Sequence, residues 1–410
     1  TCNLCFNCKI TMLVLNLIKY NVNFVLIIKI KFSEMLKYVK YFLPTLTGLA
    51  YIYIIGKGEY YPAFFLIGFS LLIIVGDYVM PRDKKIQHFS YPEILNLSLY
   101  INFPILLTIV LITISFLSTD KPTWIIDVFQ TYIYSDFTES GTYFNSIDKL
   151  SMIIQTSLLM GMLGVVPGHE LTHRVKSKFD MFIGNWLLAF SWDCTFAIEH
   201  VYGHHKHACL PEDPASAKRG ENIYLFILKA IVNEHIDGWK IELNRMRKNE
   251  LNIFSLQNKM IIGYMRSLII TYLAFFTAGI FGIIYFLICA FITKSFLEAI
   301  NYVEHYGLVR EKGQRVEMRH SWNSNHFMSS VYLYNVTRHS DHHRLAKLKF
   351  WELNPCPENA PMTPYGYLSM LYLVLLTPFM YRKIMAKKLN EWDHKYASKE
   401  EKEIVLGISH

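Results

Sequence analysis

Nine of the sixteen histidines in this 410-residue chain fall in four short clusters whose spacing suits metal binding. His169 and His173 are four positions apart, as are His200 and His204, and His205 follows directly. Residues three or four apart share one face of a helix, so each cluster can direct several ring nitrogens the same way. The nine candidate ligands are His169, His173, His200, His204, His205, His305, His339, His342 and His343.

Nine imidazoles exceed what one metal ion can use, so the pattern indicates two ions with open coordination positions. Imidazole binds zinc, copper, iron and nickel alike, and spacing alone does not name the metal. Acidic residues beside the clusters are expected to orient the rings by accepting hydrogen bonds from the nitrogens that do not bind metal. The carboxylates expected in this role are Glu170, Glu199, Asp213, Glu304 and Asp341.

The remaining histidines lack the paired spacing. We expect structural or solvated roles for His88, His235, His394 and His410, while His207, His320 and His326 lie in the motifs without a helical partner.

Two other classes of metal protein fit parts of the pattern. HELTH at 169–173 matches the HExxH signature of zinc proteases, with Glu170 as the base. A protease would need one further ligand and would leave the other clusters without a role. A metal transporter would place its ligands near the middle of membrane spans, whereas these histidines follow the ends of apolar runs.

The composition indicates a polytopic membrane protein. The chain is 52% hydrophobic with a mean hydropathy of +0.22, and a membrane span needs about 20 mostly apolar residues. The run at 260–300 is long enough for a hairpin of two spans, broken near Gly279 and Gly282. We assign the net charge of +8 to membrane topology and expect no nucleic-acid binding. The other four predicted spans are 41–57, 60–79, 94–118 and 150–168.

The distribution of basic residues orients these spans. The 80–93 connector carries Arg82, Lys84 and Lys85 and is expected in the cytoplasm, which puts all four histidine clusters on the cytoplasmic side. The predicted fold class is therefore an all-α integral membrane protein with six transmembrane helices and a cytoplasmic histidine-rich cap. We expect 1–34 to be an extension outside the fold, 35–388 to form the membrane domain and 389–410 to form a polar tail.

Four sequence blocks carry a resemblance to a known family. HELTHR, EHVYGHHKHACLPEDPAS, NYVEHYGLVR and HSWNSNHFMSSVYLYNVTRHSDHH resemble the alkane 1-monooxygenases, membrane non-haem di-iron hydroxylases related to fatty acid desaturases. The resemblance runs from about Met35 to Lys388 and implies two iron ions, O₂ as oxidant and the nine histidines as ligands. The stretch Lys206–Cys209 departs from the family pattern.

The resemblance also implies an electron donor, usually rubredoxin served by rubredoxin reductase. The sequence has no paired CxxCG motifs, so the rubredoxin is expected to be a separate protein. The segment 301–349 carries eight Lys or Arg residues against four acidic ones, which suits a small acidic carrier.

The implied reaction is terminal hydroxylation of medium- to long-chain alkanes to 1-alkanols at the inner (cytoplasmic) membrane, a step of hydrocarbon degradation. The alternative is a related hydroxylase or desaturase acting on alkyl-aromatic or fatty acyl chains. We expect the alkane to enter from the lipid bilayer, methyl end first, with bulky residues of 60–79 limiting its length.

Overall fold

The computed structural model describes residues 32–118, 144–356 and 358–407, together with positions 125, 128 and 131. Within these ranges the regular structure is helical, and the only extended pairing is an isolated bridge between Asn323 and Met362. The predicted extension 1–34 lies almost wholly outside the described residues. Its last three positions begin the first described helix, α3 (Phe32–Val39).

Four helical stretches are long and apolar enough to cross a membrane. They are α5 (Tyr61–Val79), α6 with α7 (Ile94–Leu117), the continuous helix from α9 to α10 (Ser146–Thr172), and α15 (Lys259–His305). All four coincide with predicted apolar runs. The run at 41–57 corresponds to α4 (Leu43–Ile55), which follows the 3₁₀-helix η1 (Lys40–Phe42) and has only 13 residues.

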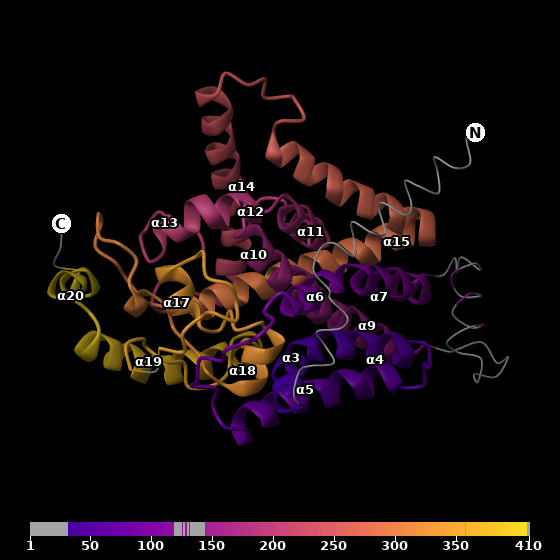
Figure 1. Cartoon of the computed structure of the whole chain (residues 1–410), viewed down its shortest axis with the longest axis horizontal. Helices are drawn as coiled ribbons and strands as arrows, with labels where there is room; N and C mark the ends of the chain where they lie inside the picture. Colours follow the sequence, from indigo (N-terminus) through magenta and orange to yellow (C-terminus); the bar gives the residue numbers. More distant parts are fainter. Residues whose placement is uncertain are drawn as a thin grey trace.

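Helix α15 changes direction in the middle. Ala278 and Gly279 leave helical geometry, and Gly279 has a φ of +58°, which favours glycine. Just beyond the break, a Cβ on Gly282 would lie 2.3 Å from the carbonyl oxygen of Ala274, so the two arms touch closely there. Figure 1 shows the ribbon of α15 turning back on itself. The predicted interruption near Gly279 is confirmed.

Two π-helical segments interrupt the helices that carry histidines. The first, η2 (Met160–Val165), joins α9 (Ser146–Leu159) to α10 (Val166–Thr172). The second, η3 (His200–His204), links α12 (Phe196–Glu199) to the short α13 (His205–His207). Single π-turns inside α-helices are rare and occur frequently at functional sites.

The helix α11 (Lys178–Ala189) returns from α10 towards α12. The long α14 (Ile223–Lys248) leads to α15, and α16 (Phe327–Tyr332) and α17 (His339–Arg344) follow it. Figure 1 shows α10, α12, α13 and α17 gathered in one part of the molecule.

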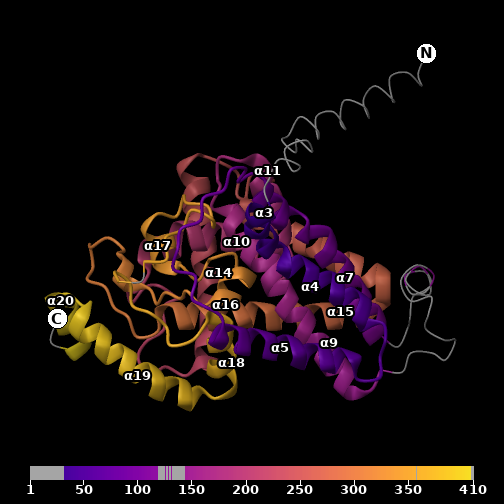
Figure 2. The ribbon, with the colours of Figure 1, turned by 60° about the horizontal axis from the view of Figure 1, so that its bottom comes forward.

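The C-terminal part folds as three helices. They are α18 (Tyr367–Leu376), α19 (Pro378–Lys395) and α20 (Lys399–Leu406), and Figure 2 shows α19 leading along the molecule to α20. The segment expected to be a polar tail after 388 is thus helical. Trp392 and Glu401 within it are fully buried, because both contact the 3₁₀-helix η4 (Met318–His320).

Candidate metal centre

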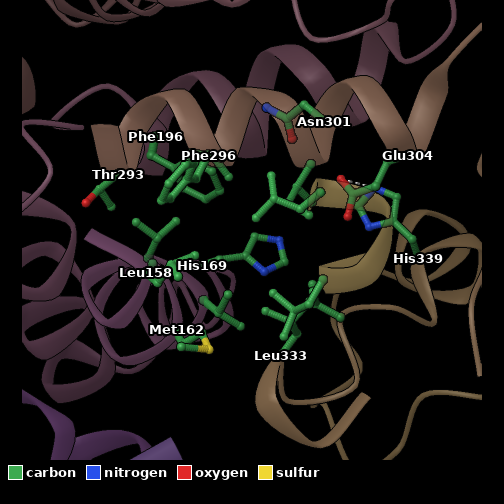
Figure 3. A pocket seen from close by; sticks show the side chains of 18 of the residues that line it. Leu158, Met162, His169, Phe196, Thr293, Phe296, Asn301, Glu304, Leu333 and His339 are labelled. Atoms are coloured by element: carbon green, nitrogen blue, oxygen red, sulfur yellow. Dashed lines mark ion pairs between the residues drawn. The ribbon is translucent and has the colours of Figure 1, made fainter. Parts of the chain in front are cut away.

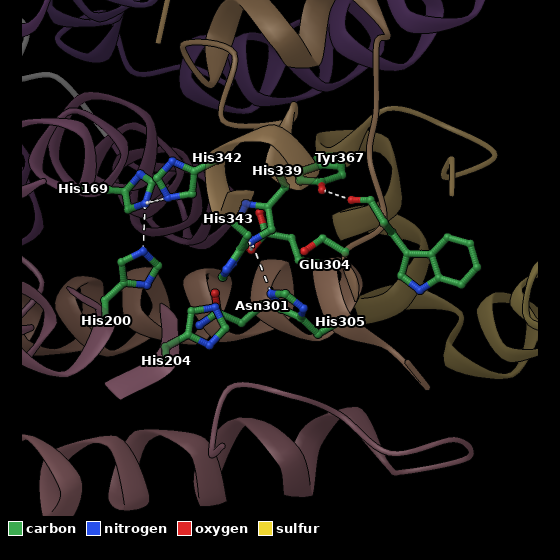
Figure 4. A network of polar contacts seen from close by, with 12 residues as sticks. His169, His200, His204, Asn301, Glu304, His305, His339, His342, His343 and Tyr367 are labelled. Atoms are coloured by element: carbon green, nitrogen blue, oxygen red, sulfur yellow. Dashed lines mark hydrogen bonds and ion pairs between the residues drawn. The ribbon is translucent and has the colours of Figure 1, made fainter. Parts of the chain in front are cut away.

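The nine candidate histidines converge in two separate groups. Within each group, one ring nitrogen from every histidine lies within 4.8 Å of the others. Figure 4 shows members of the two groups side by side, with His305 contributed by the end of α15. The five-histidine group contains His169, His173, His200, His205 and His342, and the four-histidine group contains His204, His305, His339 and His343.

The five-histidine group is centred on close contacts between Nε2 atoms. The Nε2 atom of His169 lies 2.9 Å from that of His200 and 3.1 Å from that of His342. His173 approaches His169 at 3.2 Å. His205 approaches His200 at 3.2 Å and His342 at 3.1 Å. Five rings from three segments of the chain therefore point their Nε2 atoms at one position.

The four-histidine group has the same character. The Nε2 atom of His339 lies 3.3 Å from that of His305 and 2.9 Å from that of His343. The ring of His204 lies 4.9 Å, centroid to centroid, from the rings of both His305 and His343. The groups adjoin, since the rings of His205 and His343 stack with centroids 4.4 Å apart.

The grouping differs from the α-helical pairing expected from the sequence. His200 was expected to share a face with His204, but the structure pairs it with His205. The reason is η3, because a π-turn brings residues five apart onto one face. His204 consequently points into the other group. The three histidines of α17 also divide. His342 joins the five-histidine group, and His339 and His343 join the other.

The donor set of both groups fits a metal ion. Metal–nitrogen bonds of about 2.1 Å place ligands at right angles about 3.0 Å apart, close to the observed separations. The Nε2 atom of His204 is buried without a hydrogen-bond partner, which a cation would supply. Burial lowers the pKa of His173 to about 3 and holds the pKa of His205 and His343 well below the ordinary value, so these rings present free lone pairs.

Asp213 orients His204 from the side away from the group. The Nδ1 atom of His204 lies 3.1 Å from Oδ2 of Asp213, and this carboxylate also accepts from the Ser216 hydroxyl. Burial opposes ionisation of Asp213, but the contacts with His204 and Ser216 hold its pKa below the usual value. Burial opposes protonation of His204, but the contact with Asp213 outweighs it and raises the pKa of His204, so metal binding would displace the extra proton. This contact gives the PEDPAS block a physical role.

The other four expected carboxylates are placed differently. Glu170 pairs with Arg174 at 2.6 Å, and Asp341 pairs with Arg344 at 2.6 Å, so both carboxylates are engaged by arginine side chains. Glu304 lies 3.2 Å from Nε2 of His339, which is on the side where the group converges. Glu199 is buried under the π-turn, where burial raises its pKa.

Three histidines outside the nine lie close to the site in sequence and join neither group. They are His207, His320 and His326. His320 nevertheless contributes through its backbone, because its carbonyl oxygen accepts a hydrogen bond of 2.9 Å from Nδ1 of His305. His235 lies on α14 with its Nδ1 atom 3.0 Å from the carbonyl oxygen of Ile231, as a structural histidine would.

A narrow apolar cavity of about 70 Å³ reaches both histidine groups. Three parts of the chain line it, 158–169, 293–304 and 333–371, with Phe196 and His200 from α12 and η3. Figure 3 shows Leu158 and Thr293 at one end and Glu304 and His339 at the other. No residue of α5 lines this cavity, so the lining gives no support to the expectation that bulky residues of 60–79 limit the chain length.

A buried ionic cluster lies beside the site, and the pattern of histidines did not predict it. The ammonium group of Lys294 lies 2.8 Å from Asp193, 2.7 Å from Glu234 and 2.7 Å from Glu298. All four side chains are at most 5% exposed. Asn301 donates to Glu298 and lines the cavity, so the cluster adjoins the site. A lysine inside an apolar run was the available signal.

Comparisons with known proteins agree with this geometry. The fatty acid desaturase family model matches residues 150–373. The chain is 37% identical over 259 residues to alkane 1-monooxygenase 1 of Pseudomonas aeruginosa, covering 62% of this chain and 66% of that protein. It is 34% identical over 275 residues to alkane 1-monooxygenase 2 of Alcanivorax borkumensis, covering 66% and 70%.

A further relative has a different named substrate. The xylene/toluene monooxygenase hydroxylase component of Pseudomonas putida is 30% identical over 261 residues, covering 63% of this chain and 69% of that protein. The chain thus spans about two thirds of the length of the relatives that it matches.

Proposed function

Because the chain belongs to the fatty acid desaturase family and, within it, to the alkane 1-monooxygenases, we propose that it hydroxylates the terminal carbon of medium- to long-chain alkanes with O₂. The observation that carries this proposal is the apolar cavity that reaches both histidine groups. A saturated chain can lie in such a cavity with one end beside the metal centre.

The metal centre is proposed to contain two iron ions, one in each histidine group. Iron in these positions would supply the activation of O₂, which no side chain of the cavity can provide. The chain's own residues orient the ligands, as Asp213 does for His204 and the carbonyl of His320 does for His305. Such outer contacts fix ring orientation and tautomer.

The cavity supports terminal attack on an unfunctionalised chain. Terminal C–H bonds are stronger than internal ones, so selectivity for the chain end must come from positioning. Leu158, Phe296 and Leu371 line the walls, and none of the residues lining the cavity is Lys or Arg. A fatty acid carboxylate would find no cation there and would face Glu304. The lining therefore favours an alkane over a free fatty acid.

We further propose six spans in the inner membrane, with the histidines on the cytoplasmic side. The break at Gly279 supports counting α15 as two spans, and the segment from α3 to α4 would supply the first. The basic connector with Lys84 and Lys85 supports a cytoplasmic location for that end of the spans.

Electrons are proposed to come from a separate rubredoxin, reduced by its reductase. The charged surface available for it is smaller than the sequence count of 301–349 suggests. Arg310 and Arg338 are buried and donate to backbone carbonyls, and Arg319 pairs with Glu401. The exposed basic side chains of this segment are Lys312, Arg315, Arg344 and Lys347.

A second candidate substrate is the methyl group of an alkyl-aromatic compound. The similarity to the xylene/toluene monooxygenase component favours it, as do the aromatic side chains of Phe196 and Phe296 on the cavity wall. A related desaturation of fatty acyl chains has less support, because the cavity offers no cation for a polar head group.

The proposal is tested with membranes that contain the chain, supplied with a rubredoxin, its reductase, NADH and a series of n-alkanes. We expect 1-alkanols as the main products and iron near two per chain. Mainly 2- and 3-alkanols would contradict guided terminal attack, and faster oxidation of xylenes would favour the second candidate. Zinc near one per chain with no oxidation would instead support a protease.

A further inference from the structure

The C-terminal helix α20 makes buried polar contacts with the 3₁₀-helix η4. Its N-terminus has a capping box in which Ser398 and Glu401 each accept from the other's backbone N–H. Glu401 is fully buried and accepts from Nε2 of His320 at 2.8 Å and from Nε of Arg319 at 3.0 Å. One carboxylate thus joins the end of the chain to two consecutive residues of η4.

The hydrogen bonds of His320 define its tautomer. Its Nδ1 atom accepts from the backbone N–H of Glu317 at 2.9 Å, so the ring proton resides on Nε2 and is donated to Glu401. The indole of Trp392 in α19 also donates to the carbonyl of Arg319 at 2.7 Å. The ring and backbone of His320 are therefore held from both C-terminal helices.

The carbonyl oxygen of His320 faces the metal centre. It accepts from Nδ1 of His305 at 2.9 Å and from the thiol of Cys209 at 3.0 Å. A proton on Nδ1 leaves the lone pair of His305 on Nε2, the atom that faces His339 in the four-histidine group. A continuous series of short contacts therefore runs from Glu401 through His320 to His305.

We propose that Glu401 is a positioning residue for His305, so that docking of α20 sets metal affinity in the four-histidine group and leaves the five-histidine group unaffected. The inference rests on the proposed metal site. The four-histidine group has the smaller number of ligands, and a misplaced His305 would leave it three. Loss of a hydrogen bond behind a metal-bound histidine typically costs about 10–100-fold in metal affinity.

The test uses the full chain in detergent, stripped of metal and titrated anaerobically with Fe(II). His204→Ala and His173→Ala serve as references for weakened binding in the four- and five-histidine groups, respectively. Glu401→Leu should bind one iron as tightly as the wild type and the other more weakly, as His204→Ala does. The upper bound is about 10–100-fold, the cost of losing the hydrogen bond between the His320 carbonyl and His305 altogether. Glu401→Gln keeps an acceptor oxygen for His320 and should restore most of the affinity.

Glu400→Leu is the matched control, because Glu400 is the exposed neighbour on the same helix turn. It should bind two irons normally. An unchanged titration of Glu401→Leu would overturn the inference. Equal weakening of iron binding at both groups would also overturn it, because general destabilisation would cause that result. If Glu401→Leu is not recovered folded, Glu401→Asp replaces it, because its carboxylate is one methylene shorter and is withdrawn from His320. Unchanged iron binding by Glu401→Asp would then overturn the inference. A wild-type chain that binds no iron would instead refute the proposed function.

Discussion

The Nε2 atoms of His200 and His205 lie 3.2 Å apart, although an ordinary α-helix would direct residues five apart to different faces. The π-turn of η3 produces this contact and turns His204, the intervening histidine of the motif, towards the second group. The backbone geometry of five residues therefore decides how two neighbouring histidines are divided between the two histidine groups.

This division predicts that substitutions of the neighbouring residues His204 and His205 reduce the iron content by different amounts. His204→Ala would leave three histidines in its group, and His205→Ala would leave four in the other. We expect both variants to lose nearly all alkane oxidation, with iron falling towards one per chain in His204→Ala and less in His205→Ala. Metal analysis of purified protein checks this. His235→Ala is the control and should retain both metal and activity, and equal iron in all three variants would contradict the division.

The cavity predicts where chain length is controlled. Phe296 lies eight residues before Glu304 on α15, about 12 Å along the helix at 1.5 Å per residue. Phe296→Ala should extend the cavity at that depth and shift the preferred alkane to longer chains. Phe64→Ala on α5 is the control, because Phe64 is 67% exposed and does not line the cavity.

Product profiles over an alkane series measure both variants. If Phe64→Ala changed the preferred alkane length and Phe296→Ala did not, the substrate channel would have to lie along α5.

The cluster around Lys294 predicts a large effect on stability. Lys294→Met would leave three buried carboxylates without their cation, and breaking a buried pair on one side costs about 3–5 kcal/mol. Thermal unfolding in detergent should show a clear decrease in Tm. Lys388→Met removes the exposed pair with Glu391 and should change stability by less than about 1 kcal/mol. Similar Tm values for the two variants would contradict this account.

The contact of Glu401 predicts a pH dependence. Burial opposes its ionisation, but hydrogen bonds from His320 and Arg319 lower the pKa of Glu401 to about 2, from 4.5. A depressed carboxyl pKa gives stability that is fully present above pH 4.5 and is lost as the pH falls towards 2. The Tm difference between the wild type and Glu401→Gln should thus be constant around neutral pH and shrink below pH 4.5. A difference that grows on acidification would contradict the ionised state.

The electron donor predicts a salt dependence. If rubredoxin docks near Lys312, Arg315 and Lys347, turnover at limiting donor should fall as salt rises, because screening shortens the range of steering to about 8–10 Å. Lys312→Glu with Lys347→Glu should raise the donor concentration needed for half-maximal rate. Salt-independent turnover would place the docking site elsewhere.

The sequence predicted the helical membrane architecture and the break near Gly279, because apolar runs and glycines act locally. It also predicted which histidines converge, since nine imidazoles in four clusters are typical of a metal centre. It did not predict their division, because a π-turn differs from an α-turn by one residue and leaves no periodic signal around His204. The burial of Glu401 could not be predicted either. Glu401 lies in a polar segment, and its burial depends on contact with His320, which is distant in the sequence.

His204 and His205 are consecutive residues that belong to different histidine groups, and so are His342 and His343. The two groups are therefore joined through the backbone at two places. Consecutive Cα atoms are about 3.8 Å apart, so each pair is a covalent link of fixed length between the two groups. Two such links, on separate helices, would limit the spacing between metal ions bound in the two groups. An inserted or deleted residue at either link would change both coordination spheres at once.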